Sequence, residues 1–90
     1  MAIENTLNER GTRYGEFADH AKIAQTLKQY MHNTQNWFEM NYDQKEALDM
    51  IMHKIARILN GDPNYLDSWH DIAGYATLVE KRLSKDIELS

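Results

Sequence analysis

The sparse placement of proline and glycine is the feature that most constrains the fold of this chain. Its 90 residues include one proline, Pro63, and four glycines. Gly11, Gly15 and Gly61 stand where periodic apolar segments stop, so Gly74 is the single glycine inside a helical pattern. No segment alternates cleanly between polar and apolar residues, whereas strong helix formers such as alanine, leucine and lysine are frequent. We therefore predict an all-α fold.

Apolar residues at steps of three and four predict a short N-terminal helix over about residues 2–10 and three long helices. The long helices cover about residues 16–32, residues 43–59, and the segment from after Pro63 to the charged run 80–86. We expect a small bundle in which the last two helices form an antiparallel hairpin, because the connection between them is short. In this interpretation residues 1–90 form a single domain.

Helix ends and buried side chains follow from the same pattern. Asp43 with Glu46 three residues later approximates a capping box, and Asn64 or Asp67 is expected to cap the last helix. The segment 33–42 is predicted to fold onto the core as an apolar lid, through Trp37, Phe38 and Tyr42. The last helix is predicted to turn six apolar side chains inward: Trp69, Ile72, Ala73, Ala76, Val79 and Leu83.

Length and charge exclude several classes of function. A chain of this size buries only about 60 to 65% of its unfolded surface, so we predict a homo-oligomer, at least a dimer. The absence of cysteine excludes disulfides and thiol chemistry. A net charge of -4 argues against general nucleic-acid binding. No apolar run has membrane-spanning length and the N-terminus does not read as a secretory signal, so we predict a cytoplasmic protein without membrane association.

Charged residues of the predicted hairpin form the first candidate site. Antiparallel packing brings Lys54 and Arg57, at the end of one helix, beside Asp67 and Asp71 at the start of the next. One interpretation is a structural ion-pair network, flanked by His53 and His70. The other is a ligand site, in which Gly74 leaves room for a ligand and Tyr75 offers a ring edge. Arg10 and Arg13, which flank the predicted turn at Tyr14 and Gly15, could also reach an anion.

Three stretches, "ERGTRYGEF", "HKIARI" and "DSWHDIAGYA", resemble a family of small phage and prophage proteins of unassigned function. The family motifs are Arg-x-x-x-Tyr-Gly, Lys-x-x-Arg-Ile and Asp-Ser-Trp-x-Asp-Ile-Ala-Gly-Tyr. They fall here on Arg10, Tyr14 and Gly15, on residues 54–58, and on residues 67–75. This resemblance implies a phage-encoded accessory protein in the cytoplasm of a bacterial host.

The last two predicted helices are also distantly similar to the all-α nucleoside triphosphate pyrophosphohydrolases. Those enzymes hold magnesium with a Glu-Glu-x-x-Glu helix followed by a Glu-x-x-Asp helix. In this chain Lys45 and Ser68 replace two of the carboxylates. The resemblance implies Mg²⁺ ligands at the remaining carboxylates, with Asp67 compensating for Ser68: Glu46, Asp49, Asp67 and Asp71.

We therefore expect a non-catalytic binder of a nucleotide, of another phosphate-bearing ligand or of a host protein. Its expected ligand-binding residues are Arg10, Tyr14, His53, Lys54, Arg57, Gly74 and Tyr75. A magnesium-dependent pyrophosphohydrolase-like enzyme is one alternative. A purely structural oligomer, braced by the ion pairs, is the other.

Overall fold

The computed structural model describes residues 2–89 and contains five helices and no strand over that range, which confirms the all-α prediction. The helices are α1 (Ala2–Tyr14), α2 (Phe17–His32), α3 (Gln35–Glu39), α4 (Tyr42–Asn60) and α5 (Leu66–Leu89). Over the described residues, none of these helices combines the length and apolar character that crossing a membrane would require.

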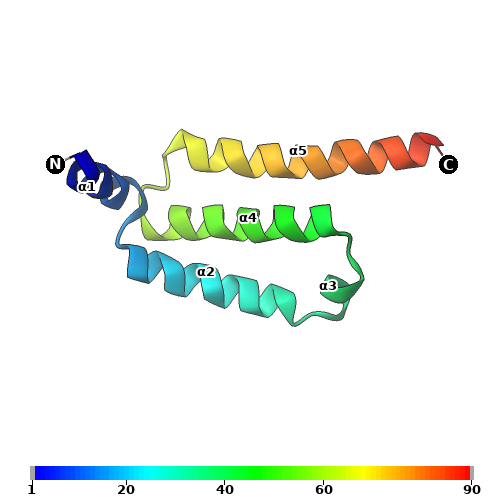
Figure 1. Ribbon diagram of the computed structural model, residues 1–90, viewed down its shortest axis with the longest axis horizontal. Coiled ribbons are helices and arrows are strands. Elements are labelled where there is room, and N and C mark those ends of the chain that lie inside the picture. The colour runs from blue at the N-terminus through cyan, green and yellow to red at the C-terminus, as the bar shows by residue number, and fades with distance from the viewer. Residues whose placement is uncertain (1, 90) are drawn as a thin grey trace.

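The three long helices lie side by side in one row, with α4 in the middle (Figure 1). α4 makes the most extensive contacts of the described chain, with α5 on one side and α2 on the other. α1 packs across the end of this row, beside the start of α2 and the α4–α5 connection, while the C-terminus lies at the opposite end (Figure 1). Within residues 2–89, α4 is therefore the long helix that has another long helix on each side.

The buried core between the long helices is small and consists mainly of alanine. Ala24 of α2 and Ala47 and Ala56 of α4 are buried, together with Trp37 of α3. Alanine at a helix contact lets the two backbones approach closely, but it buries little apolar area. Among the described residues no large side chain is fully buried.

Several helix ends differ from the prediction. α1 continues through Gly11 to Tyr14, since a methyl-sized space around this glycine is open and nothing there forces the helix to stop. α4 begins two residues early: the Asn41 backbone N–H donates to the Gln44 side chain at 2.9 Å, so the expected Asp43 cap is wrong. α5 starts at Leu66, not at a cap on Asn64 or Asp67, and it runs through the charged segment to Leu89.

The predicted lid and the predicted inner face of α5 are correct only in part. Trp37 is buried against His32, but Phe38 and Tyr42 are exposed. Ile72 and Val79 of α5 are half-buried, as expected for inward residues. The other four predicted inward side chains are exposed, because α5 packs mainly against α4, through one narrow stripe: Trp69, Ala73, Ala76 and Leu83.

Candidate ligand-binding site

Two segments distant in sequence meet at the end of the row, and we call this contact, residues 13–16 with residues 60–62, the glycine junction. The Asn60 side-chain amide donates to the carbonyl oxygens of Tyr14 at 2.8 Å and Glu16 at 3.0 Å. The Asp62 N–H donates to the Arg13 carbonyl at 2.7 Å. These bonds hold the end of α1 against the end of α4.

Glycine is required on both sides of this junction. Gly15 has φ +78°, a left-handed conformation that side chains other than glycine rarely adopt. A Cβ atom at Gly61 would collide with the Arg13 carbonyl oxygen and the Tyr14 backbone. The predicted Arg-x-x-x-Tyr-Gly turn is therefore a docking point for the α4–α5 connection, and it fixes where α1 lies.

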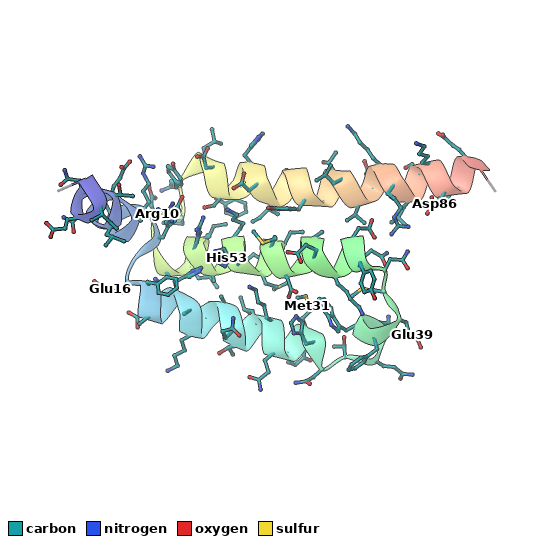
Figure 2. All side chains as sticks on the ribbon, in the orientation of Figure 1. Arg10, Glu16, Met31, Glu39, His53 and Asp86 are labelled. Carbon is teal, nitrogen blue, oxygen red and sulfur yellow. The ribbon has the colours of Figure 1, made fainter. Side chains whose placement is uncertain are left out.

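A cavity of about 760 Å³ opens beside the glycine junction, between α1, α2 and α4. Figure 2 shows Arg10, Glu16 and His53 at this end of the molecule. Four predicted ligand-binding residues line the cavity: Arg10, Tyr14, His53 and Arg57. His20, Phe17, Glu16 and parts of α1 complete the wall. The volume lies within the range of small-molecule sites, roughly 300 to 1,000 Å³.

Two histidines form the inner wall of this cavity. The ring centroids of His20 and His53 lie 4.6 Å apart with an edge-to-face interplanar angle of 83°. His20 is only 3% exposed, and its Nδ1 atom is buried without a hydrogen-bond partner. Buried polar atoms in proteins are nearly always hydrogen-bonded, so an unpaired buried nitrogen of this kind is unusual.

The pKa values of His20 and His53 are both lower than that of an unperturbed histidine. Burial, followed by the charge of Arg57, lowers the pKa of His53 to about 4. Burial also lowers the pKa of His20, and the charges of Arg57 and Lys28 lower it further, while a hydrogen bond with the Ala56 backbone acts in the opposite direction. Both imidazoles are therefore neutral near pH 7, and each can offer one N–H donor and one nitrogen acceptor.

Arginine supplies the positive charge of the cavity. The Arg57 guanidinium lies over the Tyr14 ring, with Cζ 4.2 Å from the ring centroid. Within residues 2–89 no carboxylate forms an ion pair with Arg57 or with Arg10, whereas Arg13 next to the cavity pairs with Glu9 at 2.5 Å. Glu16 is the one acidic residue in the lining. Two arginines thus face the cavity with charge available to an anion.

The residues of the site predicted between the last two helices do not lie together: His53 and Arg57 line the cavity, whereas Lys54 contacts α5. Of the two predicted cations, Lys54 pairs with Asp71: the Nζ to Oδ2 distance is 3.0 Å, and the hydrogen bond from Lys54 lowers the pKa of Asp71. The expected pairing of Arg57 with Asp67 or Asp71 is wrong, because Arg57 turns to Tyr14 and the Tyr65 hydroxyl donates to Asp67 at 3.2 Å.

Gly74 and Tyr75 lie on α5, away from the cavity. A Cβ atom at Gly74 would meet nothing within 4 Å, so the expected close approach at this glycine is absent. Tyr75 is half-buried and does not line the cavity. Of the seven predicted ligand-binding residues, Lys54, Gly74 and Tyr75 therefore lie outside it.

The predicted magnesium ligands are not brought together. Asp49 accepts a hydrogen bond from His32 Nε2 at 2.6 Å, while Asp71 pairs with Lys54 and Asp67 with Tyr65. Across the part of the chain that the structure describes, no group of three or more histidine and acidic side chains, Glu46 included, is placed to hold a metal ion. The arrangement of these carboxylates does not fit a magnesium centre of the pyrophosphohydrolase kind.

Comparison with known protein families identifies the family of this chain. A model of a domain of unknown function, DUF6378, matches residues 1–83. The chain belongs to the DUF6378 family. No curated protein and no solved structure matches it. The match to DUF6378 includes every residue that lines the cavity and both sides of the glycine junction.

Sequence reasoning missed Phe17 of this DUF6378 domain in the candidate site, and it also missed His20. It lies four residues before Ala24, on the stripe that continues through Leu27 and Met31 toward α4. A histidine on the apolar stripe of a helix was the available signal. The pairing with His53 needed the packing of α2 on α4, which the stripe alone does not specify.

Proposed function

We propose that the cavity between α1, α2 and α4 binds a phosphate-bearing small molecule, a nucleotide being the best fit, without catalysing its turnover. The observation that carries this proposal is the pair of arginines in the cavity lining, Arg10 and Arg57, neither of which is ion-paired with a carboxylate within residues 2–89. An anion bearing several oxygen acceptors would satisfy the imidazole donors and the guanidinium groups together.

Each lining residue has a role that its chemistry supports. Arg57 offers a planar set of donors that suits phosphate oxygens, and Tyr14 holds this guanidinium from one side. Arg10 supplies a second cation from α1. Phe17 is 77% exposed at the cavity rim, where its ring can stack on a base. Charge, hydrogen bonding and a ring face are thus available within one volume.

Binding is favoured over hydrolysis by the placement of the carboxylates. A pyrophosphohydrolase mechanism needs several carboxylates around magnesium and the substrate phosphates, and Glu16 is the only acidic residue in the cavity lining. Three acidic residues of α4 and α5 are instead engaged with other side chains: Asp49 with His32, Asp71 with Lys54 and Asp43 with Arg82. We propose accordingly a phage-encoded accessory protein that sequesters its ligand in the cytoplasm of a bacterial host.

A thermal-shift screen with nucleotides and inorganic phosphate tests this function. At about 100 times its dissociation constant a ligand stabilises the fold by about 2.7 kcal/mol, which moves the unfolding midpoint of a chain this size by more than about 10 °C. Arg57→Ala should abolish the shift, because it removes the main phosphate contact. Lys54→Ala is the matched control: it deletes the same charge three residues away, outside the cavity, and should retain the shift.

Two results would contradict the proposal. A screen without any shift removes the ligand and leaves a host-protein partner or a structural role. Magnesium-dependent pyrophosphate release from a nucleoside triphosphate, lost in Asp71→Asn but not in Arg57→Ala, would restore the hydrolase and place its site between α4 and α5.

A further inference from the structure

One side of the helix row is apolar and uncovered. On α4 an uncharged stripe at steps of four and three runs through Gln44, Leu48, Ile51, Ile55 and Leu59, and each of these residues is half-buried or exposed. A shallow apolar groove of about 280 Å³ joins this stripe to α5, and it is lined by Met40, Gln44, Ala47, Leu48, Ile51, Ala76 and Val79. We call this surface the apolar face.

The apolar face continues along α5. Helical steps place Ile72, Ala76, Val79 and Leu83 on one stripe beside the groove, and Trp69 lies seven residues before Ala76. Trp69 is 53% exposed, although tryptophan in a monomeric protein is usually well covered. The polar stripe of α4, with Asp49, His53 and Arg57, points elsewhere on the helix.

The solvent-accessible surface area of the chain is larger than expected for a compact monomer of its mass. It is 6861 Å², whereas a compact monomer of 10.6 kDa exposes only about 5,500 Å². The excess of about 1,400 Å² exceeds the roughly 800 Å² that each partner buries in a standard stable interface. A single copy therefore exposes enough additional surface to supply one side of a dimer interface.

We infer that the apolar face is the interface of a symmetric homodimer, in which the α4–α5 side of one copy packs on the same side of another. In a dimer with two-fold symmetry both copies contribute the same surface, so the apolar face can pack against its own copy on the partner. The groove and stripes carry no charge, so the net charge of -4 on each chain does not oppose the contact locally. The ligand cavity lies beside α1, so the two proposals are independent.

Sedimentation equilibrium tests this interface with a matched pair of variants. The wild type should have twice the 10.6 kDa mass of the chain at micromolar concentration. Ala76→Glu should raise the dimer dissociation constant at least about 100-fold, since a two-fold contact would bury the new carboxylate of each copy without a partner. Ala76 is exposed in the single chain, so a folded monomer tolerates the substitution.

Leu78→Glu is the control. It lies two residues further along α5, on a different side of the helix, and removes a larger apolar side chain that is 65% exposed. It should leave the mass unchanged. A second readout uses the wild type alone, because the unfolding midpoint of a dimer rises with protein concentration.

Three outcomes would overturn the inference. The first is a wild type of monomeric mass whose midpoint does not depend on concentration. The second is an Ala76→Glu variant that stays dimeric. The third is dissociation caused by Leu78→Glu as readily as by Ala76→Glu, which would indicate non-specific association through exposed apolar residues.

Discussion

Replacing Gly61 by alanine is expected to lower the free energy of unfolding by about 3 kcal/mol, the upper end of the usual cost of overpacking. The added methyl group would collide with the Arg13 carbonyl oxygen and with backbone atoms of Tyr14, none of which can rotate away as a side chain does. Relief requires moving α1 from α4, which also stretches the hydrogen bond from Asp62 to Arg13. Urea denaturation followed by circular dichroism measures the loss.

Gly74→Ala is the matched control for this prediction. It makes the same chemical change in a helix where the methyl group meets nothing within 4 Å. Alanine in an exposed helix interior is better than glycine by about 0.5 to 1 kcal/mol, so this variant should be more stable than the wild type. Equal effects of the two substitutions would contradict the close approach at the glycine junction.

Acid is expected to destabilise the protein well above the pH at which its carboxylates titrate. The pKa of His53 is about 4 in the folded chain against 6.5 for an unperturbed histidine, so between these values the unfolded chain binds a proton that the folded chain does not. Stability is therefore greatest above about pH 6.5 and falls as the pH drops toward 4. His20, whose pKa is also lowered, acts in the same direction.

The expected loss from His53 is about 2 kcal/mol. The full shift would correspond to about 3 kcal/mol, and partial solvent access to the ring reduces it. Denaturation midpoints across this pH range measure the effect, and His53→Gln should flatten the profile because it removes the titrating group. The lowered pKa values of Asp43 and Asp71 also reduce stability in acid, but only below about pH 5, so the fall between pH 6.5 and 5 reports the histidines. A wild-type profile that stays flat from pH 6.5 to 4 would contradict the buried histidine pair.

The helices themselves could be predicted from the sequence, because their signals are local. Pro63 and the apolar repeat at steps of three and four bound the long helices, and these signals do not depend on how the helices pack. The end of the first helix was predicted wrongly at Gly11, because a glycine alone is not a sufficient signal for a helix end. Glycine weakens a helix by only about 1 kcal/mol, so α1 passes through it when nothing else ends the helix.

The candidate site could be predicted only in fragments, since its parts come from three helices. Tyr14, His53 and Arg57 were recognisable as polar residues in motifs or on a polar stripe, but the sequence does not say that α1 reaches them. That contact depends on Gly15 fitting against Asn60 and on Gly61 fitting against the backbone of residues 13–14, two segments more than forty residues apart in the sequence. The rotation of α4 then decides that Lys54 meets Asp71 while Arg57 turns to the cavity.

The glycine junction also bears on the order in which the chain assembles. Residues 13–16 can dock only on residues 60–62, so α1 must wait for the turn between α4 and α5, and closing so long a loop adds an entropic cost to that step. α1 has few other contacts with the rest of the molecule, so it is expected to detach more readily than the row of long helices does. Backbone amides of α1 should then exchange with deuterium faster than those of α4. The proposed ligand contacts α1 as well as α2 and α4, so its binding would slow the exchange of α1.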